Sequence, residues 1–277
     1  MGGSTLTLSA RVRACLCECD PVQKVACVRS LYTDWQAESV PLDDDLPGDS
    51  VDQPGQPPGL TLVSPHQVPR RRMDTQAGRA ALVHALAHIE FNAINLALDA
   101  VHRFPAMPRE YQTDWLQVAD EEAQHFSLLA AHLHTLGQTY GDFPAHSGLW
   151  DMALKTAHDP LVRMALVPRV LEARGLDATP LIVAKLRAAN DAQLIGILAR
   201  IERDEIGHVA IGNRWYGWLC SQRGLDPSAT FRQLLAEYDA PPLRPPFNIE
   251  ARRRAGFGED ELAWLASLQG LQSERGG

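Results

Sequence analysis

The feature that most constrains the fold is a pattern of Glu and His residues that occurs twice along the chain. The pattern consists of Glu90, Glu122, His125, Glu172, Glu205 and His208. The two Glu-x-x-His motifs are 83 residues apart, and each follows a single Glu by 32 or 33 residues. One such motif has little weight, because composition alone predicts roughly half an occurrence in a chain of this size. The shared register of all six residues predicts two copies of one structural unit.

The chemistry of this pattern is that of a two-metal site. Residues i and i+3 lie on one helix face, so the Glu and His of each motif can reach the same ion. Bundles that hold two iron or manganese ions take one Glu from each of two helices and Glu-x-x-His from each of the other two. Four carboxylates balance two divalent ions, for which we expect iron, with manganese or a mixed Fe/Mn pair as alternatives. Surface glutamates with incidental histidines are the competing interpretation.

The surroundings of Glu90 support a buried site. One helical turn away on either side lie Leu86 and Ala87, and Ala93 and Ile94. A carboxylate on so apolar a face is costly unless it is paired or coordinated to a cation.

Three more acidic residues lie beside the motifs. Glu121 and Asp204 each precede a ligand Glu, and we expect them to accept a hydrogen bond from the second ring nitrogen of a ligand histidine. A solvent-facing position is the alternative for both. Glu202 precedes Glu205 by one turn, whereas Ala119 takes the equivalent place in the first copy. Glu202 is a candidate catalytic residue, as an additional ligand, a proton relay or a gate, and an ordinary surface charge is equally open.

Histidines and aromatic residues elsewhere have weaker claims on a site. His84 and His88 lie on a different helix face from Glu90, because two residues turn a helix by about 200°. We expect these two histidines in core or interhelical hydrogen bonds. The crossover after the second helix also carries Tyr140, His146 and Trp150, near a plausible cavity mouth.

Helix signals dominate the chain, and no segment alternates like a strand, so the fold class is all-α. We expect long helices over residues 75–103, 109–136, 160 to beyond 172, and 190–222. Gly175 and Pro180 predict an interruption of the third helix. The result is a four-helix bundle with an internal two-fold repeat and extra N- and C-terminal helices.

Composition shifts divide the chain into four regions. They are an N-terminal helical segment over 1–39, a Pro/Gly/Asp-rich strap or linker over 40–74, the bundle over 75–224, and a C-terminal helical extension over 225–277. In the outer regions and the crossover we expect shorter helices, two in the first forty residues and others near 151–157, 228–238 and 260–268.

Net charge and apolar runs bear on partners and location. The formal net charge of −8 gives no general support for binding nucleic acid or anionic membranes. No stretch reaches the roughly 18–20 continuous apolar residues of a membrane span, and the N-terminus lacks a signal-peptide core. We therefore expect a cytoplasmic protein without a membrane partner.

Four of the five cysteines lie near the N-terminus, at Cys15, Cys17, Cys19 and Cys27. In a reducing cytoplasm free thiols are the simplest expectation. A soft-metal site and a disulfide are the alternatives.

Several longer stretches point to a known family. With VADEEAQHF, YGDFPAHSGLW, LVPRVLEARGLDATP, DEIGHVAIGNRW and PPFNIEARRRAGF, the chain resembles a bacterial ferritin-like family known as domain of unknown function 455. The resemblance covers about residues 75–258, and the N-terminal helices more weakly. Within the ferritin-like superfamily it implies that the six residues of the repeated pattern are metal ligands. The Gly175–Pro180 break departs from the straight helices of storage ferritins and could open a cavity beside the metals.

Together, the ligand set and the resemblance predict a non-haem di-iron oxidoreductase that activates O2 or peroxide on a small or exposed substrate group. No flavin or iron–sulfur motif is visible, so an external electron donor is implied. Superfamily branches also include a tRNA-base hydroxylase, but the acidic charge counts mildly against nucleic acid. The alternatives are a ferroxidase, iron-handling or peroxide-reducing protein, and a non-catalytic interaction protein stapled by metals. The substrate and a homodimeric state stay open.

Overall fold

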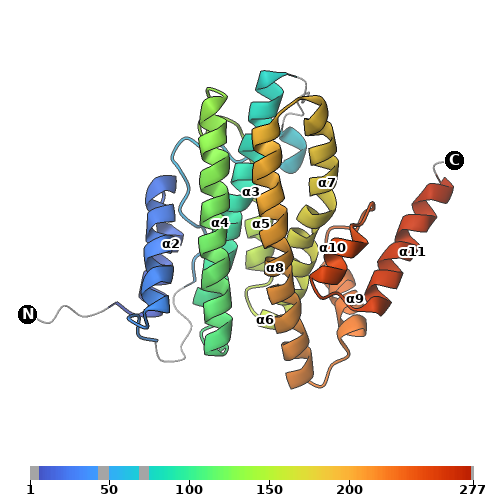
Figure 1. Cartoon of the computed structure of the whole chain (residues 1–277). Coiled ribbons are helices and arrows are strands. Elements are labelled where there is room, and N and C mark those ends of the chain that lie inside the picture. Colours follow the sequence, from blue (N-terminus) through green and yellow to red (C-terminus); the bar gives the residue numbers. More distant parts are fainter. Residues whose placement is uncertain (1–5, 43–49, 69–74, 276–277) are drawn as a thin grey trace, which may run out of the picture. The chain divides into compact units, whose positions relative to one another are not determined.

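The computed structural model describes residues 6–42, 50–68 and 75–275 (Figure 1). Regular secondary structure in these ranges is helical, apart from one isolated parallel bridge between Leu62 and Ala145. The all-α class is therefore confirmed. Residues 43–49 and 69–74 of the predicted strap lie outside the described ranges. Backbone contacts divide the chain into two compact units, Met1–Leu154 and Lys155–Gly277.

A pair of long helices forms the centre of the first unit. These are α3 (Gln76–Arg103) and α4 (Arg109–Thr135), which pack along each other (Figure 1). Thr75 begins α3 as its N-cap, because its side chain accepts a hydrogen bond from the backbone N–H of Gly78 at 3.0 Å. Both helices match their predicted bounds to within one residue. Within the described residues, α3 alone is long and apolar enough to span a membrane, and it is mostly buried, as core helices are.

Shorter helices complete the first unit. They are α1 (Leu8–Cys17), α2 (Pro21–Gln36), the 3₁₀ turn η1 (Pro65–Gln67) and α5 (Gly148–Lys155). Asp20 caps α2 by accepting from the N–H groups of Val22 and Gln23, and Pro21 takes the first helical position. α1 packs against α3, and α2 packs against α4. The two predicted N-terminal helices are thus confirmed.

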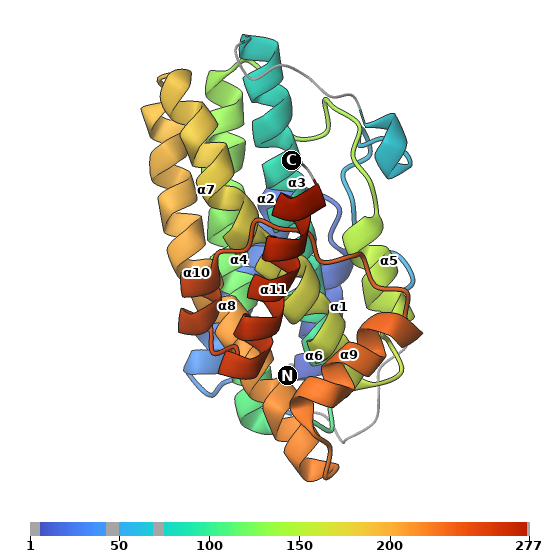
Figure 2. The same ribbon diagram turned by 90° about the vertical axis from the view of Figure 1, so that its right-hand side faces the viewer.

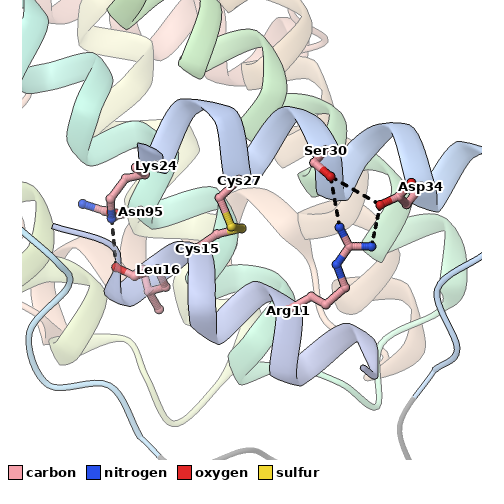
Figure 3. The surroundings of a disulfide bond; sticks show 8 residues. All are labelled: Arg11, Cys15, Leu16, Lys24, Cys27, Ser30, Asp34 and Asn95. Atoms are coloured by element: carbon pink, nitrogen blue, oxygen red, sulfur yellow. Dashed lines mark hydrogen bonds and ion pairs between the residues drawn. A yellow bond between two sulfur atoms is a disulfide. The ribbon is translucent and has the colours of Figure 1, made fainter. Parts of the chain in front are cut away.

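A disulfide joins α1 to α2. Cys15 and Cys27 have their Cα atoms 5.5 Å apart, within the range that a disulfide bridges (Figure 3). The expectation of free thiols is wrong for this pair, because packing of the two helices brings residues 12 apart in sequence into contact. Cys17 and Cys19 are free and exposed, as expected.

Lys24 is fully buried beside this disulfide. Its Nζ donates to the carbonyl of Leu16 at 2.9 Å and to Oδ1 of Asn95 at 2.7 Å (Figure 3). The ammonium group also lies 5.1 Å from the centre of the Phe91 ring. Burial lowers the pKa of Lys24 to about 7, against the opposing charges of nearby Cys and Glu side chains.

The described residues of the second unit form six α-helices and one π-helical turn. The α-helices are α6 (Pro160–Leu166), α7 (Ala173–Ala188), α8 (Ala192–Gln222), α9 (Pro227–Glu237), α10 (Ile249–Arg254) and α11 (Glu259–Arg275), the last three forming the C-terminal part seen in Figure 2. The π-turn η2 (Val167–Glu172) connects α6 to α7. Sequence signals predicted α8 and α9 closely, but they did not predict α10.

The predicted break at Gly175 and Pro180 is wrong, since α7 runs through both residues. Pro180 has no N–H to donate to the carbonyl of Leu176, one turn earlier. The side-chain amide of Asn248 donates to that oxygen instead, at 3.2 Å. A contact from the C-terminal extension therefore offsets the missing helix bond.

The interruption lies one turn earlier, in η2. There the N–H of Ala173 bonds the carbonyl of Pro168, five residues back, so the chain gains one residue relative to an α-helical turn. Pro168 packs on α8 at Gly212, where an added Cβ would lie 2.3 Å from the Cβ of Pro168. Only a glycine at this position permits so close an approach.

Two buried arginines form ion pairs that connect the C-terminal helices to the rest of this unit. Arg169 of η2 donates to both carboxylate oxygens of Glu261 in α11, at 2.7 and 2.9 Å, and also bonds Asn213. Arg252 of α10 makes a two-pronged bond to Asp177 of α7 at 2.6 and 3.0 Å. These ion pairs offset the cost of burying the two guanidinium groups.

Candidate metal centre

The first unit brings three of the predicted ligands together. His125 Nδ1 lies 3.2 Å from Oε2 of Glu90 and 3.2 Å from Oε2 of Glu122. One ligand atom from each of the three residues lies within 4.8 Å of the others. All three side chains are buried, with Glu122 and His125 fully so. This group, called the first half-site below, could hold a metal ion.

Its electrostatics favour a cation. Burial, and then the charge of Glu122, raise the pKa of Glu90 to about 8. Burial by itself lowers the pKa of His125, but hydrogen bonds and charge from Glu122 and Glu90 outweigh burial and raise it to about 11. Two carboxylates in a dry site are costly without positive charge beside them, and His125 lies within 3.2 Å of both. A divalent ion is the alternative source of that charge.

Aromatic side chains next in sequence to two of the ligands pack against each other. Phe91 follows Glu90 and Phe126 follows His125, and their ring centres are 5.2 Å apart. Tyr140 packs on both rings, at 5.2 and 5.1 Å. These contacts join α3 and α4 to the crossover that carries Tyr140.

His84 and His88, on another face of α3 than Glu90, form hydrogen bonds with the crossover segment between α4 and α5. His88 lies 2.8 Å from the Tyr140 hydroxyl through Nδ1 and 3.0 Å from the carbonyl of His146 through Nε2. His84 Nε2 accepts from the backbone N–H of Gly141 at 3.0 Å. Burial lowers the pKa of both histidines. Both histidines are buried, as the expectation of core or interhelical histidines required, but the partners shown here lie in the crossover and not in another helix.

The second unit carries the other three predicted ligands. Glu172 is the last residue of η2 and is half-buried. Glu205 and His208 lie one turn apart on α8, with His208 Nδ1 3.8 Å from Glu205 Oε2. His208 is buried, and the Glu205 side chain is 12% exposed. The i, i+3 spacing thus places carboxylate and imidazole on one helix face in both units, as predicted.

The flanking acids make contacts of their own. Glu121 accepts from the side chain of Gln117 at 2.9 Å, and Asp204 pairs with Arg203 at 3.3 Å and with Arg200 at 3.7 Å. Glu202 lies one turn before Glu205 on α8 and is half-buried. The roles assigned to these three acids stay predictions.

Sequence reasoning missed two features near the ligands. One is the π-turn that ends on Glu172, for which Pro168 inside the third helix was the available signal. The other is the bond between His88 and Tyr140, which joins residues 52 apart in sequence. Tyr140 had been singled out only as a residue near a cavity mouth.

Comparison with known proteins gives a family without a known activity. The family model described as "Protein of unknown function (DUF455)" matches residues 17–263. A protein of Haemophilus influenzae, described as an uncharacterized protein, is 46% identical over 271 residues, covering 94% of this chain and 93% of that one. No solved structure matches.

Proposed function

Since the chain belongs to the DUF455 family, whose description states no activity, we propose a function from its own residues: that of a non-haem di-iron oxidoreductase with a ferritin-like bundle. The six residues of the repeated pattern hold two metal ions, iron first and manganese or a mixed pair as alternatives. The observation that carries this proposal is the first half-site, where two buried carboxylates and an imidazole converge within 4.8 Å.

Charge balance supports one ion for each copy of the pattern. Two glutamates and one neutral histidine carry a charge of about −2, which one divalent ion neutralises. The copy in the second unit offers the same three donors in the same register. Carboxylate with imidazole suits Fe(II) and Mn(II), and three protein donors leave coordination positions for a small molecule.

Bound metal would supply the redox chemistry, by activating O2 or peroxide and passing its oxidising power to a substrate. The chain's own residues position and protect that chemistry. Phe91 and Phe126, each next in sequence to a ligand and packed with Tyr140, would limit the access of water. In this proposal Glu202, one turn before Glu205, holds or passes a proton.

In this proposal the second unit determines substrate selectivity, because it departs from the regular helix pattern. Its single-Glu ligand sits on a π-turn, a feature that often accompanies functional sites. Glu202 has no acidic counterpart in the first unit, where Ala119 takes the equivalent position. Electrons come from an external donor protein or reductant.

Metal analysis of the purified full-length chain tests the metal assignment. After aerobic expression with iron and manganese supplied, we expect about two metal ions per chain. Glu90→Ala and Glu205→Ala should each lose most of the metal, whereas Glu110→Gln, an exposed acid on α4, should keep it. Almost no metal in the purified wild-type protein would refute the proposal.

Oxygen consumption tests the reaction. The reduced, iron-loaded protein should consume O2 slowly by itself and faster with a true substrate, and it should elute as a small particle on gel filtration. A cage-sized particle that accumulates many iron ions per chain would replace the oxidoreductase with an iron-storage protein.

A further inference from the structure

A second potential site lies within the first unit, on a different face of α3. A cavity of about 550 Å³ opens between the end of α1, the segment around residues 52–56, α3 and α5. Its size is that of a small-molecule site. The residues that matter for its chemistry are Cys17, Cys19, Asp52, Asn92, Trp150 and Asp151.

The cavity is separate from the first half-site. Asn92 and His88 both line it and lie four residues apart on α3, so they share one helix face. Glu90 lies between them in sequence and points about 200° away from either. The cavity therefore uses the face of α3 opposite to the face that carries the metal ligand.

The charged side chains among the described residues that line the cavity are acidic. Asp52 and Asp151 contribute two carboxylates, and no lysine or arginine is among the described residues that line the cavity. Trp150 Nε1 donates to the backbone carbonyl of Asp52 at 2.8 Å, which ties the two acidic walls together. An anion would be repelled from this cavity, and a cation would be attracted.

Asn92 adds an acceptor with a fixed direction. The residue is 5% exposed, and its Nδ2 donates to the carbonyl of His88 at 2.9 Å, which sets the orientation of the amide. Among the described residues none donates to its Oδ1, so this oxygen is left for a donor in the cavity. A ligand N–H could donate to this oxygen.

The nearby His88 side chain does not alter the preference of the cavity for a cation that donates hydrogen bonds. Its Nε2 lies 3.0 Å from the carbonyl of His146, which can only accept, so Nε2 carries the proton. Its Nδ1 then accepts from the Tyr140 hydroxyl at 2.8 Å. Both ring nitrogens are already used.

We propose that this cavity binds a small organic cation with primary amine groups. Ammonium groups donate up to three hydrogen bonds each, and the residues that line the cavity include two aspartates and the Asn92 amide. The volume exceeds what a bare ion needs. The acidic and acceptor-rich lining, in turn, disfavours a purely apolar ligand.

Calorimetric titration of the full-length chain with three four-carbon probes tests the charge argument. We expect 1,4-diaminobutane to bind at least about tenfold more tightly than 1,4-butanediol, and succinate not to bind. Asp151→Asn should weaken diamine binding about fivefold, whereas Glu110→Gln should leave it unchanged. Equal binding of diamine and diol, or no diamine binding at millimolar concentration, would overturn the proposal.

Thiol protection tests the location. Cys17 and Cys19 line the cavity and are exposed, whereas Cys220 is buried and Cys15 is bonded to Cys27. Diamine should slow the alkylation of Cys17 and Cys19 by iodoacetamide, mapped by mass spectrometry, and succinate should not. Binding without protection, or protection that survives Asp151→Asn and Asn92→Leu unchanged, would place the ligand elsewhere and refute the assignment. Metal content, measured on the same samples, reports separately on the proposed metal centre.

Discussion

Replacing the buried lysine with a neutral residue of similar length should change how stability depends on pH. In the fold, Lys24 has a pKa of about 7, against 10.5 for a free lysine. Between these two values the unfolded chain keeps a proton that the folded chain has lost. Raising the pH through this window therefore stabilises the wild-type fold. Lys24→Met removes the titrating group and with it this dependence.

The magnitude follows from the size of the shift. One unit of pKa corresponds to about 1.36 kcal/mol, so the wild type should gain about 2 kcal/mol relative to Lys24→Met between pH 7 and pH 9. The variant also deprives Leu16 and Asn95 of a donor, at a cost of about 1–3 kcal/mol. That cost does not vary with pH, so the slope isolates the lysine.

Urea unfolding followed by circular dichroism at pH 7, 8 and 9, with the disulfide intact, measures the slope. Lys185→Met, an exposed substitution on α7, is the matched control and should run parallel to the wild type. Parallel curves for wild type and Lys24→Met would show that burial does not perturb this lysine, and the reasoning would fail.

Two further predictions concern the close contact between Gly212 and Pro168 and the disulfide between α1 and α2. Gly212→Ala should cost about 1–3 kcal/mol of stability in thermal unfolding, because its Cβ would lie 2.3 Å from that of Pro168; Gly217→Ala on the same helix meets nothing within 4 Å and should be neutral or slightly stabilising. Equal effects of the two alanines would contradict the close approach. Cys27→Ser should lower the free energy of unfolding by about 3 kcal/mol, from the loop that its bond to Cys15 closes. A reductant should lower the free energy of unfolding of the wild type by the same amount. If the reductant left the stability of the wild type unchanged, the contribution of the disulfide would be refuted.

Local signals were enough to predict most of the helices. The bounds of α3 and α4 follow from Thr75 as a cap and from proline and glycine at the ends, all of which act within one turn. α10 was missed because its six residues follow a proline-rich stretch and are stabilised by Arg252 reaching Asp177, 75 residues away. The break in the third helix was placed wrongly because a distant amide, Asn248, satisfies the carbonyl that Pro180 leaves free.

By itself, the sequence determined the identity and register of the six candidate ligands. The 3.6-residue helical period places Glu and His of each motif on one face, and this depends on chain geometry alone. Only the tertiary structure decided which groups meet across helices. The convergence of Glu90 on His125, the disulfide at Cys15 and the burial of Lys24 all arise from packing between segments that no local pattern relates. Contact across helices depends on how side chains fill shared space, and that is a property of the whole packed unit.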